Sequence, residues 1–240
     1  RFTSDNSSDF NSSNSIRVLL NNTSAELTIS VDDGIIVSDD KYSLAEVASG
    51  NKLKFSNDRE KLKLTIGEKE FVKNKFFLTS SDETEIIKID GKKYRGRLIV
   101  FLKDSEVKVV NQIGLEDYTK GVMIKEMPVG KGTENYEALK AFSICIRTYA
   151  YNKINENKDF FDIYPDTRDQ VYGGVDGETK YTNSIVDETR DQILIYDTEP
   201  AIIFYHSTCG GYTENISNVF SKKNIPYLIG IKDGDEPYCK

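Results

Sequence analysis

The chain has 240 residues, of which 38% are hydrophobic, so it can bury a sizeable core as one large domain or two smaller ones. Its formal net charge of -7 argues against nucleic acid and anionic lipid as partners, because both attract basic surfaces. A polyanionic substrate would have to be held by local cations. We find no apolar run near the roughly 18 residues that a membrane-spanning helix requires.

Residues 1–15 are rich in Ser, Asn and Asp and contain little that could be buried, so we expect a flexible linker. The first residue is Arg1 and not Met, which is compatible with an upstream signal or membrane anchor. Such a segment would suit an exported protein.

The segment 16–112 is predicted to be almost entirely strand. Its apolar or alternating runs cover residues 16–20, 26–30, 34–38, 52–56, 61–67, 75–79, 85–89, 96–102 and 107–110. Turn-forming Asn, Asp, Ser and Gly residues separate these runs. The spacing predicts an antiparallel sandwich or barrel-like layer, and we interpret this part as a scaffold or docking surface.

The segment 113–240 has a mixed pattern. A helix is predicted over 115–126, ended by Met127-Pro128, because the residue before a proline avoids the helical region. A loop follows, with Thr133 or Asn135 as N-cap of a helix that runs to about Asn152. We then expect a short helix over 179–188 and a hairpin with arms 192–196 and 201–207.

The predicted fold class is therefore α+β. An N-terminal antiparallel β-rich part precedes a mixed helix and strand part, and the two are expected to form a groove. The alternative is one continuous domain over 16–240.

Glu126 is the first candidate for chemistry. It ends an apolar helix, where the negative end of the helix dipole and neighbours such as Met123 and Met127 favour the protonated carboxyl. A carboxyl group held in this state can serve as a general acid. From local features alone, a solvated surface glutamate is the favoured interpretation.

Lys140 and Arg147 are seven residues apart, close to two helical turns, and so share one helix face. They could bind substrate carboxylates or hydroxyls, or orient Glu126. An ordinary solvated face explains the spacing equally well. For Arg147 a buried, bidentate structural role is a further alternative.

The loop with Gln170 and Tyr172 supplies an amide and a phenol suited to sugar hydroxyls, and the ring of Tyr172 could stack on a sugar face. As a motif the loop is weak by itself.

His206 and Cys209 permit three interpretations. They could form a thiol nucleophile with its base, or a zinc site completed by Cys239. A structural disulfide between Cys209 and Cys239, with His206 as a strand-end hydrogen-bonding residue, is favoured over both. Gly210 and Gly211 then allow a sharp turn or the close approach of a polymer. Cys145 fits a buried hydrophobic position.

Taken together, the motifs resemble the stage II sporulation protein D family from about Ile16 to the end of the chain. The words that carry the resemblance are YRGRLIV, LEDYTKGVMIKEMP, EALKAFSICIRTYA, DQVYGG, FYHSTCGGYTE and PYLIGIKD, in this order. Members of the family are peptidoglycan lytic transglycosylases, which cut glycan strands between N-acetylmuramic acid and N-acetylglucosamine without water.

The resemblance implies a role for each matching residue. Glu126 of the EMP motif would be the catalytic acid, and Lys140 and Arg147 match positions implicated in activity. Substrate-binding positions would be filled by Gln170, Tyr172, Ser207, Gly210 and Gly211. It also favours the disulfide of Cys209 with Cys239, and it implies neither a cofactor nor a metal.

The implied mechanism uses one carboxyl group as acid and then as base, so the second carboxylate of ordinary glycosidases is not required. Glu134 or Asp169 could still supply one. The main alternative is a non-catalytic amidase-enhancer or wall-binding module, since the same domain occurs in such proteins. A zinc- or thiol-dependent peptidase ranks last.

The expected partners are peptidoglycan glycan strands, with a cell-wall amidase and other sporulation proteins as further candidates. Neither nucleic acid nor membrane contact by this segment is expected, although an upstream anchor would fit. The resemblance places the protein outside the cytoplasm, in the cell wall or intermembrane space of a Gram-positive spore-former.

Overall fold

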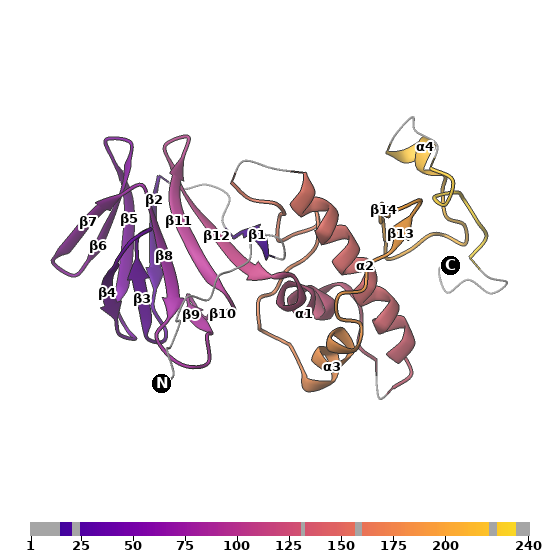
Figure 1. Ribbon diagram of the computed structural model, residues 1–240, viewed down its shortest axis with the longest axis horizontal. Helices are drawn as coiled ribbons and strands as arrows, with labels where there is room; N and C mark the ends of the chain where they lie inside the picture. The colour runs from indigo at the N-terminus through magenta and orange to yellow at the C-terminus, as the bar shows by residue number, and fades with distance from the viewer. Residues whose placement is uncertain (1–14, 21–24, 131–132, 157–159, 221–224, 234–240) are drawn as a thin grey trace, which may run out of the picture. The chain divides into compact units, whose positions relative to one another are not determined.

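The computed structural model describes residues 15–20, 25–130, 133–156, 160–220 and 225–233. The chain divides into two compact units, Arg1–Ile202 and Ile203–Lys240, which are described separately (Figure 1). The predicted linker lies outside the described residues except for Ser15, which begins the first strand.

Two antiparallel sheets make up the β-rich part of the first unit (Figure 1). The six-stranded sheet has the order β1 (Ser15–Leu19), β12 (Glu106–Gly114), β11 (Arg97–Lys103), β8 (Lys75–Ser80), β3 (Ile35–Ser38) and β4 (Ser43–Val47). The four-stranded sheet has the order β2 (Glu26–Ser30), β5 (Lys52–Asp58), β6 (Lys61–Ile66) and β7 (Lys69–Lys73). A hairpin of β9 (Ile87–Ile89) and β10 (Lys92–Tyr94) accompanies them.

Alternation along the strands builds the core between the sheets. In β6, Leu62 and Leu64 are fully buried while Lys61 is exposed. Phe55 of one sheet lies with its ring centroid 6.0 Å from that of Phe76 of the other. The predicted antiparallel, two-layer β part is thus confirmed.

Strands β4 and β7 were not predicted from the sequence. Both are edge strands, and each buries little, so their sequences SLAEV and KEFVK lack the apolar alternation on which the prediction depends.

Three helices complete the first unit: α1 (Leu115–Glu126), α2 (Tyr136–Asn155) and α3 (Lys180–Glu188). They group together beyond the end of β12, from which α1 continues directly (Figure 1). One hydrophobic core runs from the sheets into the helices and includes Tyr118, Val122, Ile146 and Ile185. The predicted α+β fold class is therefore confirmed, although the core crosses the predicted boundary at residue 112. No helix within the described ranges is both long and apolar enough to cross a membrane.

The helix boundaries agree closely with the prediction. Helix α1 ends at Glu126, with Met127 in an extended conformation before Pro128. Asn135 is the N-cap residue of α2, and Thr179 caps α3 through a reciprocal hydrogen-bonded box with Thr182.

The predicted hairpin over 192–207 is wrong in its second arm. The observed strands are only β13 (Ile195–Tyr196) and β14 (Glu199–Pro200), and residues 201–206 form no strand. Asp197 and Thr198 have φ of 49° and 71°, so the turn is a tight two-residue one and the arms pair early. One further backbone hydrogen bond, from Ala201 N–H to the Leu194 carbonyl at 2.8 Å, joins the two arms beyond Pro200. The second unit contains the short helix α4 (Ile216–Val219) and an isolated bridge between Tyr212 and Lys232.

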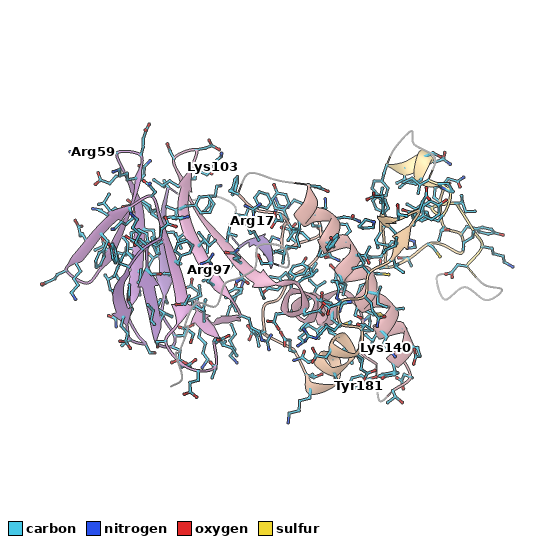
Figure 2. The ribbon with its side chains drawn as sticks, viewed as in Figure 1. Arg17, Arg59, Arg97, Lys103, Lys140 and Tyr181 are labelled. Atoms are coloured by element: carbon cyan, nitrogen blue, oxygen red, sulfur yellow. The ribbon has the colours of Figure 1, made fainter. Side chains whose placement is uncertain are left out.

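A half-buried ion pair attaches the segment around residue 162 to strand β1. Asp162, with 4% of its side chain exposed, accepts hydrogen bonds from the backbone N–H and the guanidinium of Arg17 at 2.7 Å each. Leu19 N–H also donates to the carbonyl of Ile163 at 3.1 Å. The free edge of the six-stranded sheet is thereby covered (Figure 2 labels Arg17 beside β1).

We expect Asp162→Asn to lower the free energy of unfolding by about 2 to 3 kcal/mol, because it leaves the Arg17 cation without its buried partner. Asp166→Asn is the matched control: Asp166 also pairs with an arginine, Arg168, but both side chains are more than 40% exposed. Urea denaturation of the two variants measures the difference. Equal, small losses would show that the Asp162 contact does not hold this edge.

Candidate functional site

Glu126 is held in place by a backbone amide from a distant segment. It is the last residue of α1 and is half-buried. Its Oε1 accepts a hydrogen bond from Val171 N–H at 2.5 Å. Its Oε2 forms no hydrogen bond with any of the residues that the structure describes. The carboxyl group is therefore fixed through one oxygen only.

The segment that supplies this amide is anchored on both sides of Val171. Before it, Asp169 accepts hydrogen bonds from Tyr149 O–H at 2.7 Å and Tyr164 N–H at 2.9 Å. The fully buried Gln170 accepts a hydrogen bond at Oε1 from Tyr118 O–H at 3.1 Å. These contacts come from α1, α2 and the neighbouring loop, so the segment has little freedom to move.

Tyr172 anchors the other side from within the core. Its ring stacks on that of Tyr118 at 5.3 Å between centroids, and its O–H donates to Asn111 Oδ1 at 2.8 Å. Burial raises the pKa of the phenol well above its usual range. Because Tyr172 is only 8% exposed, its ring offers no open face for the sugar stacking expected from the sequence. Its contacts are those of a positioning residue.

Helix α1 and this segment approach each other at backbone distance, which requires Gly121. A Cβ atom at that position would lie 2.6 Å from the Tyr172 ring and 2.7 Å from the carbonyl oxygen of Gly174. The carbonyl of Gly121 also accepts the N–H of Gly173 at 3.1 Å. A side chain of any size here would push the segment away from the helix.

Arg147 lies in the interior and is 1% exposed. Its guanidinium forms a bidentate pair with Glu116, with hydrogen bonds of 2.8 and 2.7 Å. It also donates to the carbonyl oxygens of Gln192 at 3.0 Å and Val186 at 3.3 Å. These contacts match the buried, bidentate structural role that the sequence left open as an alternative for Arg147.

Arg147 does not orient Glu126 directly, contrary to one of the sequence-based hypotheses. Its partner Glu116 is ten residues from Glu126, which corresponds to about 15 Å along α1. Arg147 borders a cavity of about 490 Å³ at the N-terminal end of this helix, together with Asp117, Tyr151 and Arg190. The two residues therefore belong to opposite ends of α1.

Lys140 lies on the surface near the start of α2 (Figure 2). Its Nζ is 3.7 Å from Glu188 of α3 and 5.2 Å from the centroid of the Tyr136 ring. The hydrogen bond of Tyr136 O–H to Glu188 raises the pKa of Tyr136 to about 12. Lys140 is thus a half-exposed cation in a small polar cluster between α2 and α3.

The other acidic candidates differ in exposure. Asp169 is 4% exposed at its side chain and forms an ion pair with Lys153 at 3.3 Å in addition to its hydrogen bonds. Glu134 is exposed in the turn before α2. Asp169 is committed to anchoring the loop, whereas Glu134 is open to solvent.

The remaining predicted residues belong to the second unit. Ser207 and Gly210 are exposed, and Gly210 and Gly211 have φ of 66° and 96°, as expected for a sharp glycine turn. The Cys209 thiol lies 3.0 Å from an Asp233 carboxylate oxygen. Cys239 lies outside the described residues, so the disulfide stays a prediction.

His206 borders an apolar cavity of about 470 Å³ within the second unit, lined also by Phe204 and Phe220. Among the described residues, no three His, Cys, Asp or Glu side chains gather as a metal site would require.

Sequence reasoning missed Tyr118, Asn111 and Gly121. A glycine inside an apolar helix was the available signal, because such a residue often marks a close backbone approach. The partners of Tyr118 and Asn111 lie 52 and 61 residues away in the chain, and no local pattern specifies such pairs.

Residues 103–196 match the family described as Stage II sporulation protein. An uncharacterized protein of Brachyspira hyodysenteriae is 31% identical over 224 residues, which is 92% of this chain and 59% of that protein. The amidase enhancer of Bacillus subtilis is 33% identical over 217 residues, 89% of this chain and 28% of the enhancer. Stage II sporulation protein D of Bacillus subtilis is 31% identical over 139 residues, 51% of this chain and 39% of that protein. The chain therefore spans less than two thirds of each of these relatives. No solved structure matches it significantly.

We expect Arg147→Lys to lower the free energy of unfolding by about 3 kcal/mol, because an ammonium cannot replace the bidentate pair and both carbonyl contacts. Arg190→Lys is the control, since Arg190 is 52% exposed and pairs with Asp187 on the surface. Its effect should stay within about 0.5 kcal/mol. Denaturation in the absence of substrate decides the point: an Arg147→Lys variant as stable as the wild type would return this residue to a substrate-binding role.

Proposed function

Because the chain belongs, through residues 103–196, to the stage II sporulation protein D family, we propose that it is a peptidoglycan lytic transglycosylase with Glu126 as its single acid–base. The observation that carries the proposal is the hydrogen bond from Val171 N–H to Glu126 Oε1. It fixes a half-buried carboxyl group at a helix end while leaving its second oxygen for proton transfer. The family resemblance, through the EMP motif, also implies Glu126 as the catalytic acid.

In the proposed reaction, protonated Glu126 gives its proton to the glycosidic oxygen between N-acetylmuramic acid and N-acetylglucosamine. The bond from that oxygen to C1 breaks as positive charge develops on the muramic acid ring. The C6 hydroxyl of the same sugar then attacks C1, and its proton passes to the Glu126 carboxylate. A 1,6-anhydro end forms, no water is consumed, and Glu126 returns to its protonated state.

The contacts of the other carboxylates support a single acid–base. Asp169 accepts two hydrogen bonds and pairs with Lys153, so it has a positional role. An inverting or retaining hydrolase would need a second carboxylate opposite the first across the scissile bond. Glu134, exposed in the turn after α1, is the residue to test for that role.

Among the predicted substrate-binding residues, Lys140 suits this function best. It is half-exposed and lies near the start of α2, the helix that follows the turn after Glu126, so it can meet a carboxylate of the wall polymer. Arg147, Gln170 and Tyr172 are buried, and we assign them support of the site. In the second unit, the exposed Ser207 and Gly210 stay candidates for binding the glycan, whereas Gly211 is buried and shapes the turn.

A second candidate function is enhancement of a cell-wall amidase. It is favoured by the alignment of 89% of this chain with a protein named amidase enhancer. In that case the chain would bind the wall or the amidase, and Glu126 would be dispensable. Both functions place the protein outside the cytoplasm, with peptidoglycan as the common partner and a role in sporulation or in wall remodelling.

We expect Glu126→Gln to abolish formation of anhydro-muropeptides from purified glycan strands, with a loss of at least about 100-fold. Glutamine keeps a carbonyl oxygen for the Val171 amide but cannot donate and recover a proton. Strands with and without stem peptides would be digested, and the products separated by chromatography and identified by mass spectrometry.

Glu134→Gln is the matched control and should retain activity. If Glu126→Gln stays active while Glu134→Gln does not, the acid has been misassigned. Absence of anhydro ends from any wall substrate, together with stimulation of an amidase by both variants, would replace the enzyme proposal with the enhancer function. Loss of activity on chelation would support a metal site at His206 and Cys209.

A further inference from the structure

We propose that Tyr118 is a positioning residue that orients Glu126 through the Gln170-Val171 segment. The inference rests on the proposed function for its catalytic consequence, but its structural basis is independent of the substrate. Tyr118 and Glu126 belong to the same helix, α1, and contact adjacent residues of the same segment.

The two hydrogen bonds run in opposite directions between helix and segment. Tyr118 O–H donates to the Gln170 side chain at 3.1 Å, and Val171 N–H donates to Glu126 at 2.5 Å. The helix therefore holds the segment with one side chain and is in turn held by the segment's backbone at its last residue. Between them, the Gly121 carbonyl accepts the N–H of Gly173. This closed set of contacts fixes the Val171 amide relative to the helix that carries the acid.

The hydrogen bond from Tyr118 to Gln170 is costly to lose because both side chains are buried. Tyr118 and Gln170 are both fully buried, so no water replaces a lost hydrogen bond. The Gln170 Nε2 has no hydrogen-bond partner among the described residues. The amide of Gln170 thus depends on the Tyr118 hydroxyl, and without it the side chain would shift toward a new partner and displace the adjoining Val171.

The effect on Glu126 follows from geometry. Its carboxyl group is held through Oε1 alone, so the direction of the Val171 N–H sets the torsion of the group and hence the position of Oε2. A displacement of about 1 Å at a proton-transfer atom is enough to reduce a rate strongly. The other anchors of the segment, at Asp169 and Tyr172, limit the displacement and preserve the fold.

Tyr118→Phe tests the proposal, because it removes the hydroxyl and keeps the ring that stacks on Tyr172. Tyr181→Phe is the matched control: the Tyr181 hydroxyl on α3 is buried and has no hydrogen-bond partner among the described residues (Figure 2 labels this residue). Both variants should melt within about 5 °C of the wild type.

The first readout is the Val171 amide, followed by NMR during a pH titration without substrate. Its proton shift should follow the titration of Glu126 in the wild type and lose this response in Glu126→Gln. In Tyr118→Phe the amplitude should fall by about half and amide exchange should accelerate by about tenfold, since the hydrogen bond is no longer held in one geometry. Tyr181→Phe should match the wild type.

The second readout is the kinetics of anhydro-muropeptide formation. Tyr118→Phe should lower kcat about tenfold and change KM by less than about twofold, as expected for a group that acts on the transition state. A Val171 response equal to that of the wild type would overturn the positioning role, and so would an unchanged kcat in an active enzyme. If the wild type forms no anhydro ends, the proposed function fails, and the NMR titration still decides whether Tyr118 orients Glu126.

Discussion

The buried guanidinium of Arg147 is the interaction on which the arrangement of the helices depends. It joins Glu116 in the first turn of α1 to the carbonyl oxygens of Val186 in α3 and of Gln192 beyond it, and it projects from α2. A charged group in the interior is tolerated only when its hydrogen bonds are satisfied, so all of these partners must stay in place together. Helix α1 is thereby fixed at its N-terminal end, and the position of its other end follows.

That other end carries the candidate acid, and a different kind of contact controls it. Glu126 lies about 15 Å along the helix from Glu116 and depends on the backbone amide of Val171. The intervening Gly121 lets the helix and the 170–174 segment touch without side chains between them. One end of α1 is thus secured by a buried ion pair and the other by a loop that several elements hold. With both ends of α1 held, the half-buried carboxyl group of Glu126 has a fixed position at the end of the helix.

The sequence predicted most of this frame because its signals are local. Alternating strands and Pro128 after the first helix act within a few residues, and the structure agrees with them. The second arm of the hairpin was wrong because an apolar run does not reveal how far two strands stay paired, and the observed pairs are only Ile195 with Pro200 and Tyr196 with Glu199. The edge strands β4 and β7 were missed because they bury too little to show an apolar pattern.

The candidate site was only partly predictable, and the reason is again physical. The EMP motif and its order with the later motifs marked Glu126, but the contacts that hold it join residues 45 or more positions apart. Arg147 and Tyr172 have the side-chain types of substrate-binding residues, but both are buried, and their contacts support the fold around the site. Residue type predicts which chemistry is available, whereas only the fold determines whether a substrate can reach it.

The contact of Val171 with Glu126 suits a group that must act in both protonation states. A backbone N–H can donate to a carboxylate oxygen and, more weakly, to the carbonyl oxygen of a protonated carboxyl group, so the geometry need not change when the proton moves. The proton then enters and leaves through Oε2 while Oε1 stays bound. Ordinary glycosidases need a second carboxylate as nucleophile or to activate water, whereas here the substrate's own C6 hydroxyl attacks and one group serves as donor and then acceptor. The fixed amide therefore keeps this one carboxyl group in place for both of its roles in the proposed reaction.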